Sequence, residues 1–264
     1  AAGVKPIQGV EVTLENGHHL VLLAKGPEGY ANLCRLLTRA HLGNQRLHPR
    51  TSVQSLREHA EGLIALSGCR QGEIPNLMLH GKYREALAAA VQYREIFGPE
   101  NFFLELQACR LPGDTAKNRA LAQLADHLGL GIVASANVHY LGKDEFPVHD
   151  LLTCVRTLTK LEEIHPERRL NAENYLKDSR EMGELFRDFP LALENSLRIP
   201  EECDPALNLN AQLFPAFPVP GGEIPAGYLK KLVYEGATRR YRRIDDRIAH
   251  RLEHELNIIC RLGY

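Results

Sequence analysis

The stretch Ile132-Val133-Ala134-Ser135-Ala136-Asn137-Val138-His139-Tyr140 begins as a run of apolar residues and ends in polar, metal-capable side chains. It predicts a buried strand, and because side chains alternate along a strand, Asn137 and His139 are expected on the same face. A helical pattern precedes it from Thr115 to Leu128, and Gly129 ends that pattern. Parallel-sheet and barrel enzymes carry their sites at the carboxyl ends of such strands. The stretch therefore predicts an α/β fold and the position of a functional site.

Two more units of a helix followed by a strand precede this one. Their helices run from Ser52, as the N-cap, to about Ala60 and from Tyr83 to Phe97, and their strands are Leu63–Leu66 and Phe102–Leu106. Three consecutive units with short connections predict a largely parallel sheet or a barrel. The segments before them are two strands joined by the turn Glu15-Asn16-Gly17, and a helix: Ile7–Leu14, Leu20–Ala24 and Pro27–His41.

Beyond Phe146 the pattern becomes helical and then breaks. Helices are expected at Val148–Leu161, at Ser179–Phe186 with Ser179 as the N-cap, and at Pro190–Ile199. The segment from Asp204 to Pro225 is rich in proline, asparagine and glycine, which is typical of an extended linker. Two helices follow it. The predicted division is therefore a first domain at 1–205 and a second region at 206–264, with helices Tyr228–Tyr241 and Asp246–Leu262.

The composition limits the class of protein. The 264 residues are 44% hydrophobic and 25% charged, which is typical of an ordinary globular protein and excludes disordered and collagen-like chains. The formal net charge of −1 provides no overall field toward nucleic acid, so such contacts need a local patch. No apolar run reaches the roughly 20 residues needed to span a bilayer. This predicts no membrane association, and the six scattered cysteines, which form no CxxC pair, favour a reducing, cytoplasmic compartment.

Side chains that can bind a metal recur at the ends of the predicted strands: Glu11, His18 and His19, Cys69, and the pair Asn137 and His139. A carboxylate, imidazoles and a thiolate from separate strands could converge on a divalent ion. Spacing alone gives a weak signal, because neither HExxH nor HxH occurs. A single histidine at the end of a strand is more often a structural hydrogen-bonding residue, and Cys69 alone is more often a small buried residue.

Several motifs, in consistent order along nearly the whole chain, resemble the PHP domain of bacterial C-family DNA polymerases, the group of the DNA polymerase III α subunit. The motifs are Gly9-Val10-Glu11-Val12, His19–Ala24, Gly29–Leu33, Leu66–Gly72, Phe97–Phe102, Asn137–Tyr140, Tyr175-Leu176-Lys177 with Glu181-Met182, Phe217–Pro220, Tyr228-Leu229 with Glu235-Gly236, and Arg251–Leu256. The run Asn32–Leu42 looks closer to the error-prone branch than to the replicative one.

The resemblance implies a distorted β/α barrel, incomplete because its first strands would lie before Ala1, followed by a helical linker region that leads into the polymerase palm. It implies a divalent metal, Zn or Mn, in the PHP site. Glu11, His19, Cys69 and His139 match the ligand pattern, and Asn137 stands where the family more often has Asp. A neutral amide is a poorer ligand than a carboxylate. The polymerase active site, with its aspartates and Mg, would follow Tyr264.

The implied function is that of a fragment of a DNA-directed DNA polymerase that acts in replication or in translesion and repair synthesis. DNA and dNTPs are the expected partners of the parent protein, together with other polymerase subunits. The PHP domain would act as a 3′–5′ exonuclease or phosphoesterase, or as a scaffold, and the fragment alone is expected to be inactive as a polymerase. Two alternatives remain open: a free-standing PHP phosphoesterase and a metal-free interaction module.

A basic run near the C-terminus is a candidate contact for nucleic acid. Arg239, Arg240, Arg242 and Arg243 surround Tyr241, a composition that suits phosphate contacts beside an aromatic ring. Asp245 and Asp246 follow directly, so a solvated helix end is the more common explanation of such a run.

Overall fold

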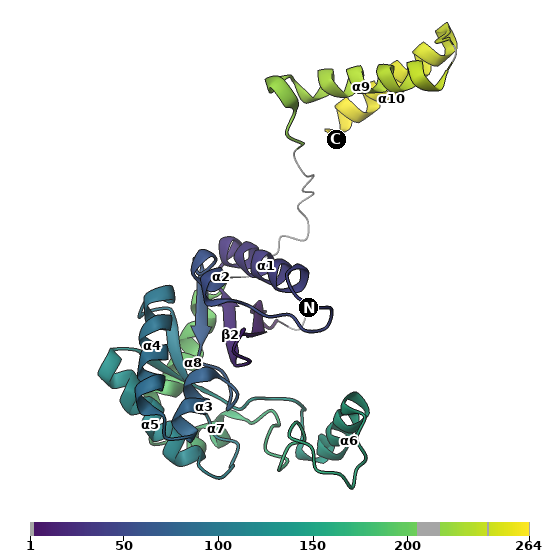
Figure 1. The fold of residues 1–264 in the computed structure, drawn as a ribbon. Helices are drawn as coiled ribbons and strands as arrows, with labels where there is room; N and C mark the ends of the chain where they lie inside the picture. Colours follow the sequence, from purple (N-terminus) through teal and green to yellow (C-terminus); the bar gives the residue numbers. More distant parts are fainter. Residues whose placement is uncertain (1–2, 205–216, 242, 264) are drawn as a thin grey trace. The chain divides into compact units, whose positions relative to one another are not determined.

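A computed structural model describes residues 3–204, 217–241 and 243–263 of the chain, and a five-stranded sheet forms the centre of its larger part (Figure 1). The strands lie in the order β1-β2-β3-β4-β5. β3, β4 and β5 pair in parallel, whereas β1–β2 and β2–β3 are antiparallel. Within the described residues the sheet does not close, because β1 and β5 form its two edges. The strands are β1 (Gly9–Thr13), β2 (His19–Ala24), β3 (Leu63–Leu66), β4 (Phe102–Gln107) and β5 (Gly131–Ser135).

The predicted α/β class is confirmed, and an open sheet of this kind is consistent with part of a distorted β/α barrel. The prediction of a largely parallel sheet holds for β3 to β5 only. The reason lies in the turn between β1 and β2, where the amide of Gly17, at φ +87°, donates to the carbonyl of Leu14 at 2.9 Å. A turn this short reverses the chain and permits only an antiparallel hairpin.

Eight α-helices lie in the described residues up to 204, and α6 lies apart from the sheet (Figure 1); the starts and ends of several helices follow local signals. The N-cap Ser52 accepts a hydrogen bond from the amide of Ser55 at 3.0 Å, and Gly129 ends a helix in the left-handed conformation, both as predicted. The N-cap of α7 is Asp178, not Ser179 as predicted: its carboxylate accepts from the amide of Glu181. The helices are α1 (Pro27–Leu42), α2 (Val53–Glu58), α3 (Glu73–Leu79), α4 (Tyr83–Phe97), α5 (Asp114–Leu128), α6 (Phe146–Thr157), α7 (Ser179–Leu185) and α8 (Pro190–Glu202).

Both faces of the interior strand β4 are buried, as expected for a strand that is largely apolar. Leu104 and Leu106 belong to the larger core, which includes residues of α4 and α5 such as Tyr93 and Leu121. Phe103 lies on the opposite face, in a second core formed with α8. The helices therefore hold the sheet from two sides, which fixes the positions of the loops that follow β3, β4 and β5.

The end of β5 differs from the prediction. The strand stops at Ser135, and Asn137 has a left-handed backbone conformation with φ +45°. Asparagine is one of the few non-glycine residues that adopt this conformation. Asn174 holds the turn, because its side chain donates to the carbonyl of Asn137 at 2.9 Å and its own carbonyl accepts from the amide of His139 at 2.8 Å. Asn137 and His139 therefore do not share the face of a strand, and the prediction that they do is wrong.

The chain divides into two compact units, 1–207 and 208–264. The second contains α9 (Pro225–Arg240) and α10 (Asp246–Leu262). They are joined through Glu253, which accepts from the hydroxyl of Tyr234 and pairs with Lys230, each at 2.8 Å. The predicted boundary at 205/206 falls on residues outside the described part and stays a prediction. No helix in the described ranges has the length and apolarity that crossing a membrane would require.

Candidate metal centre

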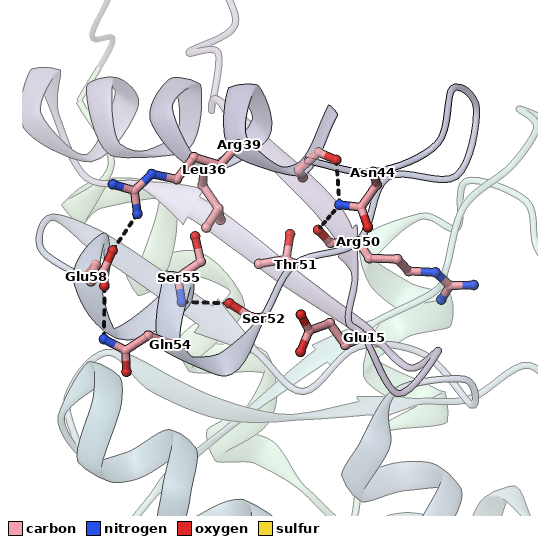
Figure 2. A pocket seen from close by; sticks show the side chains of 11 residues that line it. Glu15, Leu36, Arg39, Asn44, Arg50, Thr51, Ser52, Gln54, Ser55 and Glu58 are labelled. Atoms are coloured by element: carbon pink, nitrogen blue, oxygen red, sulfur yellow. Dashed lines mark hydrogen bonds and ion pairs between the residues drawn. The ribbon is translucent and has the colours of Figure 1, made fainter. Parts of the chain in front are cut away.

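The described residues form two notable hollows, and only one of them contains predicted site residues. The smaller, of about 280 Å³, lies between α1 and α2 (Figure 2). Its two arginines are already engaged, Arg39 with Glu58 and Arg50 with the carbonyl of Leu14 at 3.2 Å. The larger cavity measures about 660 Å³ and is lined by all five predicted residues: Glu11, His19, Cys69, Asn137 and His139.

Glu11 and His19 meet because of the register of the hairpin. His19 pairs with Thr13, so Glu11 is its diagonal neighbour on the same face of the sheet. The Nδ1 atom of His19 lies 3.2 Å from Oε1 of Glu11. Two neighbouring strands thus bring a carboxylate and an imidazole into contact.

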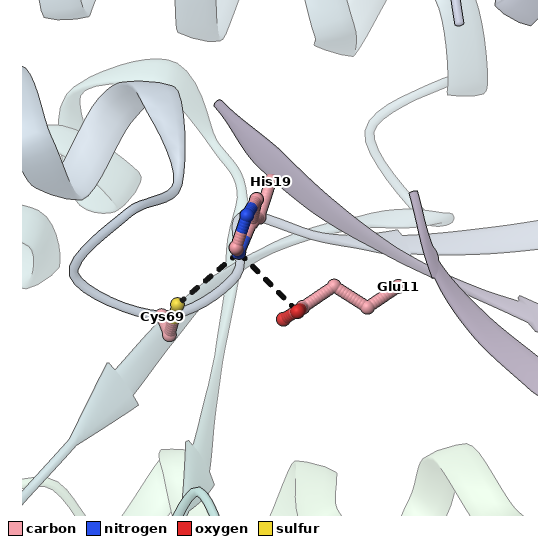
Figure 3. Close-up of side chains that lie close together, drawn as sticks. All are labelled: Glu11, His19 and Cys69. Carbon is pink, nitrogen blue, oxygen red and sulfur yellow. Dashed lines mark hydrogen bonds and ion pairs between the residues drawn. The ribbon is translucent and has the colours of Figure 1, made fainter. Parts of the chain in front are cut away.

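Cys69 reaches the same point from the loop after β3. Its Sγ atom lies 3.8 Å from Nδ1 of His19 (Figure 3). The loop is compact: a Cβ atom added to Gly72 would lie 2.1 Å from the carbonyl oxygen of Ser67, so only glycine fits there. The carbonyl of Gln71 accepts from the amide of His19 at 3.1 Å, which ties the loop to β2. The ligand atoms of Glu11, His19 and Cys69 all lie within 4.8 Å of one another.

The electrostatics of this trio favour a positive charge at its centre. Hydrogen bonds to Cys69 and to Glu11 raise the pKa of His19 to about 10. In the reverse direction, the hydrogen bond from His19 lowers the pKa of Glu11 below its ordinary value. A carboxylate, an imidazole and a thiolate form a donor set of borderline softness that suits Zn²⁺ well. The three residues therefore fit a divalent ion.

His139 lies in the cavity but outside this trio. Its Nε2 atom lies 2.5 Å from a terminal nitrogen of Arg169. Its ring packs edge-on against that of His149, with centroids 5.3 Å apart. Although the residue as a whole is exposed, desolvation of the ring and the charge of Arg169 lower the pKa of His139 to about 4. The imidazole is therefore neutral near pH 7.

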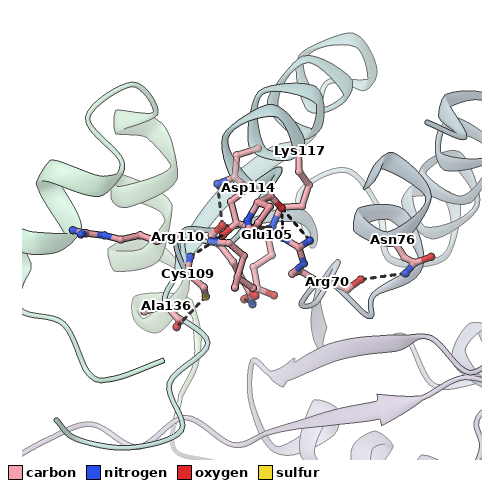
Figure 4. Close-up of polar contacts among 12 residues, drawn as sticks. Arg70, Asn76, Glu105, Cys109, Arg110, Asp114, Lys117 and Ala136 are labelled. Carbon is pink, nitrogen blue, oxygen red and sulfur yellow. Dashed lines mark hydrogen bonds and ion pairs between the residues drawn. The ribbon is translucent and has the colours of Figure 1, made fainter. Parts of the chain in front are cut away.

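Buried charges hold the wall of the cavity behind Cys69. The side chain of Asp114 accepts from the amides of Cys109 and Leu111 at 3.1 and 3.0 Å and from Arg70 at 2.7 Å (Figure 4). Lys117, only 4% exposed, lies 3.5 Å from the same carboxylate, and burial lowers its pKa. Because Arg70 follows Cys69 directly, Asp114 ties the loop after β3 to the loop after β4.

Sequence reasoning missed Arg169 and His149. Arg169 lies in the irregular segment between α6 and α7, and His149 falls within the apolar pattern of α6. Neither position has a spacing that would mark it. Of the four predicted nucleic-acid contacts, Arg239, Arg240 and Arg243 are exposed in the second unit, and Arg242 lies outside the described residues.

Comparisons with known proteins agree with the predicted resemblance. Residues 1–109 match the PHP domain family. The chain is 54% identical over 279 residues to the error-prone DNA polymerase of Symbiobacterium thermophilum, covering all of this chain and 26% of that protein. It is 36% identical over 262 residues to the DNA polymerase III subunit alpha of Thermus aquaticus (91% of this chain, 21% of that protein). It is 33% identical over 248 residues to the DNA polymerase III subunit alpha of Treponema pallidum (94% of this chain, 21% of that protein).

The predicted resemblance to the PHP region of bacterial DNA polymerases is thus confirmed. The chain spans 21–26% of the length of these curated relatives. Similarity along the whole chain includes the second unit, α9 and α10, which the PHP family match does not reach.

Proposed function

We propose, from the premise that the chain carries a polymerase-type PHP domain, that it is part of a bacterial DNA-directed DNA polymerase. Similarity at 54% identity along the whole chain to an error-prone DNA polymerase supports this proposal and favours the error-prone branch. The parent protein would extend primers with dNTPs in the cytoplasm during replication or repair synthesis, alongside other polymerase subunits. Its Mg-dependent active site would lie outside this chain, so that residues 1–205 form the PHP domain and 206–264 lead toward the palm.

The larger cavity is the proposed site of metal-dependent phosphodiester hydrolysis. The single observation that carries this proposal is the meeting of Glu11, His19 and Cys69 within 4.8 Å inside a cavity lined by cationic side chains. Zn or Mn bound there would supply a water of lowered pKa and would polarise a phosphoryl oxygen. Asn137 and His139, which the resemblance implies as ligands, line the same cavity. They do not belong to the trio.

The residues of the chain define what would bind there. Five arginine and lysine side chains line the cavity, which suits the negative charge of a nucleic-acid end. In the reaction a P–O bond forms to the oxygen of water and the P–O bond to the 3′ oxygen of the penultimate nucleotide breaks, which releases the terminal nucleotide as a 5′-monophosphate. One proton of the water passes to the leaving oxygen through solvent. Removal of a 3′-terminal nucleotide is the form of this reaction that would serve a polymerase.

A metal-free role as a scaffold is the second candidate. It is favoured by the contact of Arg169 with His139, which engages one predicted ligand, and by the amide at Asn137. A free-standing phosphoesterase is less well supported, because the similarity to polymerases continues through α9 and α10.

Metal content decides between the first two candidates. The purified chain, the His19→Ala variant and the matched control His18→Ala would be dialysed with Zn²⁺ or Mn²⁺ and measured by elemental analysis. His18 is a suitable control because its ring contacts the carbonyl of Gln71, at 3.0 Å, and is absent from the trio. We expect one ion per chain in the wild type and in His18→Ala, and none in His19→Ala. No bound ion, or an ion retained in His19→Ala, would contradict the proposed site.

The activity of the same variants would then be measured. Release of the terminal nucleotide from a 3′-mismatched primer should require the metal and should disappear in His19→Ala. The same chain should incorporate no dNTP into a primer. Incorporation by the His19→Ala preparation would contradict our assignment of the polymerase site to residues outside this chain.

A further inference from the structure

Arg169 is the one arginine of the larger cavity that lacks a carboxylate partner among the described residues. Arg70 pairs with Asp114 at 2.7 Å, Arg168 with Asp150 at 2.6 Å, and Arg156 with Glu167. The Nε atom of Arg169 is buried and has no hydrogen-bond acceptor in the described part of the chain. A guanidinium placed in this way destabilises the folded state unless another group compensates its charge.

The partner that Arg169 does have is a predicted metal ligand. A guanidinium carries only donors, so the Nε2 atom of His139, 2.5 Å away, must accept its hydrogen bond. The lone pair that accepts this hydrogen bond is the one that would bind a metal ion. The contact therefore excludes a metal ion from Nε2 of His139 as long as Arg169 stays in place.

His149 completes a set of groups around this position. Its ring lies 5.3 Å from that of His139, and its Nδ1 atom is buried without a partner among the described residues. Glu11 is close enough for its charge to act on His139, and Arg169 in turn acts on Glu11. Two imidazoles beside a carboxylate are the groups expected around a divalent ion, yet the cation found among them is a guanidinium.

We propose that Arg169 occupies a second cation position, formed by His139 and His149, and thereby limits the cavity to one metal ion at Glu11, His19 and Cys69. This inference rests on the proposed function and deepens it. The guanidinium supplies fixed positive charge for a phosphate oxygen, and its planar donors suit that geometry. It cannot lower the pKa of a water, so hydrolysis in this cavity would depend on the single ion of the trio.

The experiment counts ions whose binding depends on His139. The apo forms of the wild-type chain and of His139→Ala, Arg169→Ala and Arg169→Ala/His139→Ala would be titrated with Zn²⁺ by calorimetry, with elemental analysis after dialysis. Arg169→Gln serves as a second replacement that preserves more of the packing, and Arg156→Ala is the matched control, since Arg156 lines the same cavity but is paired with Glu167.

We expect the wild type, His139→Ala and Arg156→Ala to bind equal amounts of Zn²⁺. Arg169→Ala and Arg169→Gln should each bind one more ion per chain, and the added His139→Ala change should remove it. Loss of an ion in His139→Ala alone would overturn the inference, as would no gain in both Arg169 variants. The ion that depends on His19 tests the proposed function and the ion that depends on His139 tests this inference, so the two can fail independently.

Discussion

Replacing Asp114 should destabilise the first unit more than replacing any other carboxylate that lines the larger cavity. Asp114→Ala leaves the amides of Cys109 and Leu111 without their acceptor and leaves Lys117 as a buried cation without its carboxylate. Breaking a buried pair of this kind costs about 3–5 kcal/mol, because the remaining charge is uncompensated. For a unit of this size that cost corresponds to a fall in Tm of roughly 6–20 °C. Asp114→Asn keeps one oxygen acceptor and should be destabilised about half as much.

Urea unfolding followed by far-UV circular dichroism measures the destabilisation, with Asp188→Ala as the control. Asp188 is an exposed carboxylate that pairs with its neighbour Arg187, so its removal should leave the midpoint unchanged. Asp114→Ala should also weaken Zn²⁺ binding, because Arg70 and the adjoining Cys69 lose their anchor. An unfolding midpoint equal to that of the wild type would refute the view that Asp114 compensates buried charge.

Three further predictions test the loop after β3, the core and the second unit. Gly72→Ala should lower both Zn²⁺ affinity and Tm, because the new methyl group would lie 2.1 Å from a backbone oxygen; wild-type affinity in a calorimetric titration would mean that the loop adapts freely. Burial raises the pKa of Tyr93 above that of an unfolded tyrosine, near 10, so the folded state retains its proton longer and stability should fall as the pH rises above about 10. Tyr93→Phe should flatten this alkaline decline in urea titrations at pH 9 to 11, and an unchanged slope would exclude Tyr93 as its cause. Alanine replacement of Arg239, Arg240 and Arg243 should weaken binding of single-stranded DNA. It should also lower the slope of log affinity against log salt concentration by about one for each phosphate that is no longer neutralised. Equal slopes for variant and wild type in filter binding would indicate that these side chains are only solvated.

Elements whose ends carry strong local signals were predicted closely from the sequence. The helix Tyr83–Phe97 matches its predicted bounds, because Gly98 and Pro99 end it, and the strand Leu63–Leu66 matches because Gly62 precedes a short apolar run. The short helix α3 was missed, since its seven residues are too few to show a helical period. The end of β5 was misjudged because Asn174, far along the chain, holds the turn at Asn137. Periodicity contains no information about a contact of that range.

The candidate site was likewise predictable where a local pattern determines it, but not where it depends on contacts between distant segments. The hairpin register makes Glu11 and His19 neighbours, and an expectation that polar residues gather at strand ends was enough to select both of them and Cys69. The relation of His139 to the trio depends on Arg169, which comes from an irregular segment without a repeating pattern. Selecting residues by their capacity to bind a metal also overlooks an arginine that competes for a ligand.

The charge balance of the cavity links Arg169 to the amide at position 137. A divalent ion at His139 and His149 would bring two positive charges, and a carboxylate at 137, which the resemblance to the PHP family leads us to expect there, would offset part of them. A guanidinium brings one positive charge, and Asn137 brings none to oppose it. A guanidinium in place of the ion lowers the positive charge of the cavity by one unit. An amide in place of the carboxylate removes one negative charge, so the net charge of the cavity is the same in both arrangements. If Arg169 takes the second cation position as proposed, the neutral amide of Asn137 therefore keeps the cavity at the charge that an ion and a carboxylate would give, and Asn137→Asp should strengthen Zn²⁺ binding in Arg169→Ala more than in the wild type; equal affinities in calorimetric titration would refute this link between the two residues.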